Sequence, residues 1–206
     1  QSSPEQPTQV SGEPVEITSP FPDILEKALQ AHGGLRKWQR MNTLSFCIYQ
    51  ASEPVYQQLV DLGSRKILIR KDDVRVGYDG RVVWYSGDPS SDLLFDKKDA
   101  FQYKHYFFVA LPFLLVDKGV GHTYIGEKRI GGEVYDALEV NFQDQPEFAS
   151  LQNFLVLLDT ATHQMTWLLK RTNTEADNDL YSARLYKNWQ WVNGLLLPLH
   201  CEKYDW

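Results

Sequence analysis

The sequence predicts a mainly β (α+β) fold, a curved antiparallel sheet of about eleven strands that forms an unclosed half-barrel with a few helices covering its concave face. Three observations lead to this prediction. An amphipathic helix and a second helical turn precede the first strand within 25–46. Short strand patterns joined by tight turns fill most of the remaining chain, and only one further helix-like segment, near 98–116, interrupts them. A twisted sheet of that width curls, and it either closes into a barrel or stops as a half-barrel.

Residues 1–18 are predicted to form a flexible N-terminal tether in front of a single half-barrel domain at 19–206. The segment has no aromatic residue and no Lys or Arg, but it has several Pro, Ser, Gln and Glu. Such a composition buries too little apolar surface to offset the entropy of ordering. A flexible chain of this length reaches about 20–25 Å. It would therefore serve as a linker to a membrane anchor, and the simpler alternative is a ragged terminus.

The first helix is predicted to begin at Pro22 and to end at the Gly33-Gly34 pair. Proline suits the first helical turn, and glycine accepts the positive φ that a helix C-terminus often requires. Between these limits, apolar residues recur at helical spacing and define one buried face: Ile24, Leu25, Ala28 and Leu29.

The strands are predicted to be joined mainly by hairpins, so that neighbours are antiparallel. Three two-residue pairs suit tight type I′ turns, and the segment 159–164 suits a longer hairpin loop. The three pairs are Asp79-Gly80, Gly131-Gly132 and Asn193-Gly194. Successive hairpins make the sheet a meander.

The segment 96–119 differs from its surroundings. Asp99 can cap a helix start, and residues 107–116 are apolar on nearly every side. Because a helix that is apolar all round must be buried, we expect it on the concave face of the sheet. Pro112 is expected to break or kink this helix.

Composition excludes several classes of protein. A length of 206 residues favours one domain. The net charge of −6, without a basic stripe, argues against nucleic-acid binding. The longest apolar run, 106–116, is too short to span a bilayer. Cys47 and Cys201 match no metal or redox spacing. They are expected to be buried free thiols, with a disulfide as the alternative in an oxidising compartment.

No pattern in the sequence predicts catalysis, a metal site or a cofactor. HExxH, GxSxG and phosphate-loop motifs are absent from the sequence. His200 and Cys201 are adjacent on a predicted strand, so their side chains should point to opposite faces. We therefore expect a protein that is not an enzyme. A hydrolase stays open as the weaker alternative, since two carboxylates can converge in space without a sequence motif.

Apolar and aromatic residues form the remaining candidate site. They could simply fill the core, or they could line a cavity between the sheet and its covering helices that admits an acyl chain. Each buried CH₂ contributes about 0.8 kcal/mol, so such a cavity could bind a lipid without polar chemistry. The candidate cavity residues are Trp84, Phe101, Tyr106, Phe107, Phe108, Leu111, Phe113, Leu114, Trp167 and Trp189.

Three segments resemble an uncharacterised family of bacterial lipoproteins. They are LEKALQAHGGLRKWQRMNTLSF at 25–46, YFFVALPFLLVDKGV at 106–120 and LLDTATHQMTWLL at 157–169. That family is similar to the periplasmic outer-membrane lipoprotein carrier LolA and its receptor LolB, and the resemblance covers about 20–206. It implies an unclosed barrel whose helices lid an apolar cavity, which in the carrier receives the acyl chains of lipoproteins. It also implies a signal peptide ending in a lipidated Cys just before Gln1.

These inferences predict a cell-envelope lipoprotein, periplasmic or anchored to the outer membrane. It would be monomeric and would bind a lipid or acyl chain, such as that of another lipoprotein, in an apolar cavity. The alternative is an envelope interaction or sensor module whose core is filled and holds no ligand.

Overall fold

The computed structural model describes most of the chain beyond its first twenty residues. The predicted tether at 1–18 and the turn residue Gly80 lie outside the described part. The described ranges are 21–50, 53–79, 81–88, 101–142, 153–171 and 181–205.

The N-terminal helices form where the sequence predicts them. Helix α1 spans Asp23–Ala31, begins after Pro22 and buries the predicted apolar face. Gly33 and Gly34 follow it with φ of +103° and +91°, values that glycine adopts without a steric penalty. The short helix α2 spans Leu35–Trp38 and buries Trp38.

The first sheet contains five antiparallel strands in the order of the sequence. Along each strand, alternate side chains point to opposite faces. Leu44 pairs with Val60, Val60 with Ile67 and Ile69 with Val76, so these residues share the inner face of the sheet. The strands are β1 (Thr43–Gln50), β2 (Glu53–Asp61), β3 (Ile67–Lys71), β4 (Val74–Tyr78) and β5 (Val83–Ser86).

The second sheet contains six antiparallel strands, again in sequence order. The predicted Gly131-Gly132 and Asn193-Gly194 turns are confirmed, with positive φ at all four residues. The predicted longer loop after Asp159 is confirmed as well, and the Asp159 carboxylate accepts hydrogen bonds from the backbone N–H groups of 161 and 162. The strands are β6 (Gly121–Ile130), β7 (Glu133–Asn141), β8 (Asn153–Asp159), β9 (Met165–Arg171), β10 (Tyr181–Val192) and β11 (Leu195–Asp205).

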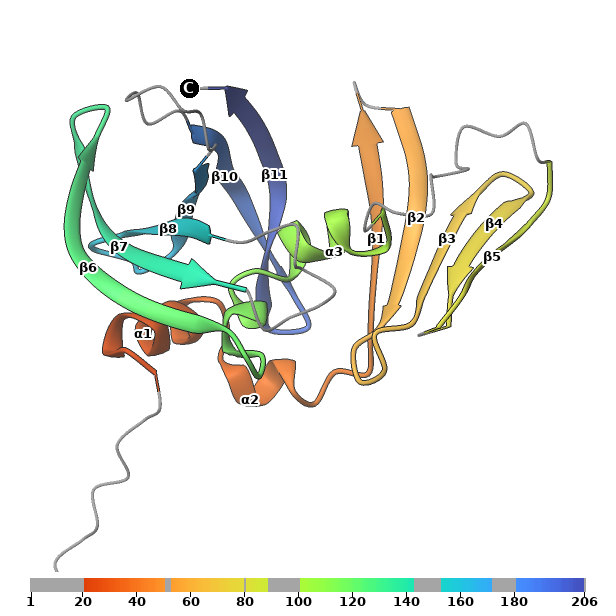
Figure 1. The fold of residues 1–206 in the computed structure, drawn as a ribbon, viewed down its shortest axis with the longest axis horizontal. Helices are drawn as coiled ribbons and strands as arrows, with labels where there is room; N and C mark the ends of the chain where they lie inside the picture. The colour runs from red at the N-terminus through yellow and green to blue at the C-terminus, as the bar shows by residue number, and fades with distance from the viewer. Residues whose placement is uncertain are drawn as a thin grey trace, which may run out of the picture.

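The predicted mainly β class is confirmed: the described residues form eleven antiparallel strands without a closed barrel. The strands are divided between two hydrogen-bonded sheets instead of following one continuous meander. The reason lies in the β5–β6 connection, which carries helix α3 (Phe101–Ala110) and the 3₁₀ helix η1 (Phe113–Val116) on either side of the expected break at Pro112. Figure 1 shows α3 between β11 of one sheet and β1 of the other. A helix apolar on all sides requires cover on all sides.

A single hydrophobic core joins the helices to both sheets. It contains Val60 and Ile69 from the first sheet, Leu138 and Tyr186 from the second, and Phe113 from η1. No helix in the described part of the chain is long and apolar enough to cross a membrane.

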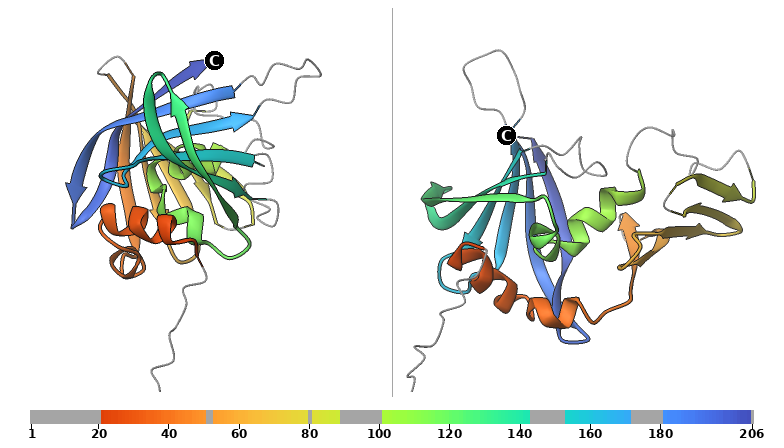
Figure 2. Two further views of the ribbon diagram at one scale, coloured as in Figure 1. Left: turned by 90° about the vertical axis from the view of Figure 1, so that its left-hand side faces the viewer. Right: turned by 60° about the horizontal axis from the view of Figure 1, so that its bottom comes forward.

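The α1–α2 corner is attached to the turn between β10 and β11. The Leu196 N–H donates to the His32 carbonyl at 2.9 Å, and Lys37 Nζ donates to the Gly194 carbonyl at 2.9 Å. A Cβ atom at Gly33 would lie 2.3 Å from the Gly194 oxygen, so only glycine permits this approach. Because the chain runs from α2 directly into β1, the corner links the second sheet to the first, as Figure 2 shows from below.

We predict that Gly33→Ala destabilises the protein more than Gly132→Ala does. Both glycines have φ near +100°, but a Cβ at Gly132 meets nothing within 4 Å. Both substitutions therefore carry the same backbone strain. The expected difference between them in unfolding free energy, about 2 kcal/mol, comes from the clash with the β10–β11 turn. Urea unfolding of the two variants gives the comparison. Equal losses of stability would contradict the close packing of the corner.

Candidate functional site

Five of the predicted cavity residues come together on α3, η1 and the segment between them. Tyr106, Phe107, Leu111, Phe113 and Leu114 are fully buried within the single core. Their side chains occupy the space between the two sheets and pack against them. These five residues therefore fill the core between the sheets. A filled core is the alternative to a cavity that the sequence left open for this set.

Two further residues of the predicted set border this core. Phe108 and Trp189 are partly buried and pack against it. The guanidinium carbon of Arg184 on β10 lies 3.8 Å above the Phe108 ring, which is a cation–π contact. Trp189 stacks on Tyr186 with ring centroids 5.8 Å apart.

Three predicted residues do not join the core. Trp167 packs against a second, small cluster formed by the other face of the six-stranded sheet. Trp84 pairs with Gly77 across β4 and β5 and covers it, on the face opposite to Val76. The side chain of Phe101 lies outside the described residues. Successive side chains on a strand point to opposite faces. Trp84 and Trp167 each lie next to an inward-pointing residue of their strand, so both face away from the space between the sheets.

Polar contacts fix α3 and η1 to both sheets. His105 on α3 is hydrogen-bonded to the Tyr56 hydroxyl on β2, and burial raises the pKa of Tyr56 to about 12. Arg65, in the turn after β2, forms a 2.6 Å ion pair with Asp117 just beyond η1. On the other side, the His122 imidazole on β6 is hydrogen-bonded to the Leu115 carbonyl oxygen in η1. The helical segment is therefore held from two directions.

The inner face of the five-stranded sheet is apolar from β1 to β5 except for the buried Gln58 on β2, and we call its apolar residues the inner apolar face. Its middle is buried in the core, whereas its β5 end is open: Val83 is 36% exposed and Tyr85 is 55% exposed. Tyr85 pairs with the buried Val76, and Val83 pairs with Tyr78. Its members are Leu44, Phe46, Ile48, Tyr56, Val60, Ile67, Ile69, Val74, Val76, Tyr78, Val83 and Tyr85.

Val83 and Tyr85 were missing from the predicted site, although the sequence carries a signal for them. Val74 and Val76 alternate with charged or small residues, and a hairpin through 79–80 places Val83 and Tyr85 on the same face. The choice of Trp84 followed side-chain size instead of this alternation. The open end of the inner apolar face is the candidate site for an apolar ligand.

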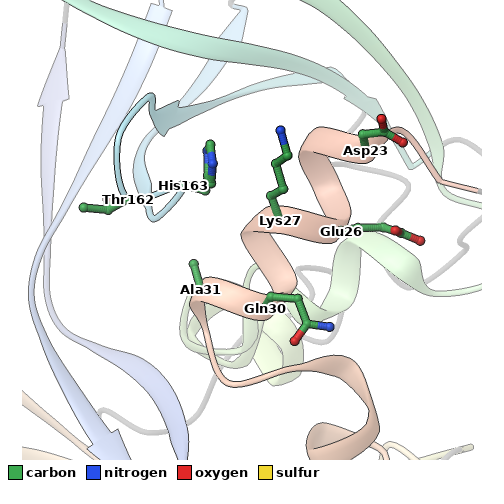
Figure 3. Close-up of a pocket in the computed structure, with 7 residues that line it drawn as sticks. All are labelled: Asp23, Glu26, Lys27, Gln30, Ala31, Thr162 and His163. Atoms are coloured by element: carbon green, nitrogen blue, oxygen red, sulfur yellow. The ribbon is translucent and has the colours of Figure 1, made fainter.

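A polar depression lies elsewhere, between α1 and the loop that joins β8 to β9 (Figure 3). It has a volume of about 510 Å³, and Lys27 and His163 extend into the same space. It contains none of the predicted cavity residues. Its other lining residues are Asp23, Glu26, Gln30, Ala31 and Thr162.

The described residues contain no group of three or more His, Cys, Asp or Glu side chains placed to hold a metal ion. The expected divergence of His200 and Cys201 is confirmed. His200 bonds the Asn188 side chain at the surface, whereas Cys201 packs against the core. Burial raises the pKa of the Cys201 thiol, which disfavours the nucleophilic thiolate.

The cysteine prediction is partly wrong. Both thiols are free, as expected, but Cys47 is exposed and Cys201 is only half-buried. Cys47 lies between the inward-pointing Phe46 and Ile48 on β1, so its own side chain points to the outer face.

Comparison with known proteins gives likeness in structure but not in sequence. No family model and no curated protein matches the chain. A LolA superfamily protein from Nitrosomonas europaea is similar over 89% of this chain and 84% of its own, with a TM-score of 0.47 and 14% identity. A DUF1329 family protein from Desulfovibrio piger is similar over 91% of this chain and 87% of its own, with a TM-score of 0.45 and 10% identity.

A LolA superfamily protein is thus among the solved structures that this chain is similar to, as the sequence resemblance predicted. The fold itself is defined by the strand order and register given above. These two likenesses add no argument about activity or ligand.

We predict a pH dependence of stability that comes from His32, the residue beside Trp189. Burial lowers the pKa of His32 to about 4, and a 2.8 Å hydrogen bond from its Nδ1 to the Ala28 carbonyl offsets this only in part. The unfolded chain, with a pKa near 6.5, takes up the proton first. The contribution of neutral His32 to the free energy of unfolding is therefore full above about pH 6.5. About 3 kcal/mol of it is lost as the pH falls to about 4.

The variant His32→Asn keeps a donor near Nδ1 and removes the titration. The difference in unfolding free energy between wild type and His32→Asn should therefore change between pH 6.5 and 4. The control is His200→Asn, the same substitution at an exposed site. The assignment fails if both variants give the same pH profile.

Proposed function

We propose that this chain is a cell-envelope lipid-binding protein that holds an acyl chain along the open end of its inner apolar face. One observation carries the proposal: a continuous apolar row leaves the core at Val76 and ends at the exposed Tyr85. A chain laid along it would extend the core contacts already made by α3. The sequence resemblance to lipoprotein carriers agrees with this choice of ligand.

The energetics suit a ligand without a polar anchor. Burying ten methylene groups contributes about 8 kcal/mol before the cost of ordering the chain. Micromolar binding corresponds to about 8 kcal/mol after that cost is subtracted, so a chain longer than ten methylene groups, or contacts beyond them, would be needed to reach it. The bulk of the binding energy would therefore come from apolar contact, which is consistent with a site that offers Val and Tyr side chains and no cluster of catalytic groups. We accordingly propose a binding protein and not an enzyme.

The envelope location and the membrane tether belong to the same proposal. The composition of 1–18 suits a linker, and the resemblance implies a lipidated cysteine in front of it. In this proposal the folded part acts as a monomer close to the membrane that supplies its lipid.

A second candidate is a protein-interaction module, and the edge strand β5 favours it. Within the described residues, β5 pairs only with β4. Val82 to Tyr85 are all exposed, so the strand presents apolar side chains on both faces. Such an edge can add a partner strand.

The two candidates are separated by neighbouring residues on β5. Tyr85 lies on the inner apolar face, and Trp84, at 44% exposure, lies on the outer face. We predict that Tyr85→Ser weakens binding of a fluorescent fatty acid by about tenfold, since it removes one large apolar contact. Trp84→Ser should leave the affinity unchanged. Titration of the purified chain with the probe measures both.

Absence of probe binding by the wild type would contradict the proposed function. An equal loss in the two variants would place the contact on both faces of β5, and it would favour the interaction module.

A further inference from the structure

The α1–α2 corner carries a cluster of cations that the proposed function does not use. Arg36, Lys37 and Arg40 are exposed and line one depression of about 840 Å³. Neither arginine forms an ion pair within the part of the chain that the structure describes. The whole chain has a net charge of −6. Three adjacent cations, with Glu26 as the carboxylate among the described residues that line this depression, run against that overall balance. We call these three residues the basic corner.

An exposed tryptophan lies near the basic corner. Trp191 is 64% exposed and lies at the end of β10, just before the turn whose Gly194 carbonyl accepts the hydrogen bond from Lys37. Its neighbour Val192 points to the opposite face of the strand. Figures 1 and 2 both show this turn beside α2. Tryptophan near lysine or arginine is a combination found at membrane interfaces.

The depression itself has both characters. Phe21, Leu29 and Leu35 supply apolar walls, and the basic corner supplies the charge. A phosphate headgroup with the start of its acyl chains matches such a lining in charge and in polarity.

We propose that the basic corner, together with Trp191, docks the protein on the surface of an anionic phospholipid membrane. The cations lie against lipid phosphates, and the indole ring enters the headgroup region. Each Lys or Arg near an anionic surface strengthens binding by about fivefold. This docking face does not depend on the acyl chain held at β5, which lies on the other sheet.

The experiment is vesicle co-sedimentation of the full chain with phosphatidylcholine alone and with phosphatidylcholine mixed with phosphatidylglycerol. We expect binding only to the mixed vesicles, weakened by high salt. The double variant Arg36→Gln/Arg40→Gln should lose about 25-fold in affinity. Arg36→Lys/Arg40→Lys, which keeps the charge, should bind like wild type. The matched control is Arg75→Gln/Arg81→Gln, the same charge change on exposed residues of the five-stranded sheet.

The apolar part has its own pair of variants. Trp191→Ser should weaken vesicle binding, whereas Tyr49→Ser, at a position 63% exposed on β1, should not. Tyr85→Ser should bind vesicles like wild type, which separates docking from acyl-chain binding. No dependence on phosphatidylglycerol, or equal losses in the corner and control arginine pairs, would overturn the proposal.

Discussion

The packing of α3 and η1 between the two sheets is the constraint on which the rest of the structure depends. The segment 106–116, which joins the end of α3 to η1, carries no charged residue and must be covered on nearly every side. The two sheets supply that cover, one through Val60 and Ile69 and the other through Leu138 and Tyr186. The Tyr56–His105 hydrogen bond and the Arg65–Asp117 ion pair then fix the orientation of the segment.

This filling decides where a ligand could bind. The middle of the inner apolar face is occupied by the protein's own side chains, and its β5 end, at Val83 and Tyr85, is its most exposed described part. The stacked pair Trp38 and Phe113, with ring centroids 4.7 Å apart, ties η1 to the N-terminal corner. The corner is in turn fixed to the β10–β11 turn by the close approach at Gly33. Through these contacts the N-terminal corner, which carries the proposed docking face, is packed against the same core as the middle of the inner apolar face.

Most of the local structure could be predicted from the sequence, because it depends on local chemistry. The helix ending at Gly33-Gly34, the Asn193-Gly194 turn and the break at Pro112 follow from backbone preferences that act over a few residues. The division into two sheets could not be predicted, since it depends on where the 98–116 helix packs. The placement of Trp84 and Trp167 has a different cause: the strand register puts both on outer faces, and this alternation can be read from the sequence.

The most direct test of this account is native mass spectrometry, with organic extraction, of the chain purified from a bacterial envelope. The account predicts one lipid bound per chain, retained in Trp84→Ser and depleted in Tyr85→Ser. A clean mass without lipid in the wild type, from a preparation that also fails to take up a fatty acid, would contradict it. The inner apolar face would then be only the margin of a filled core.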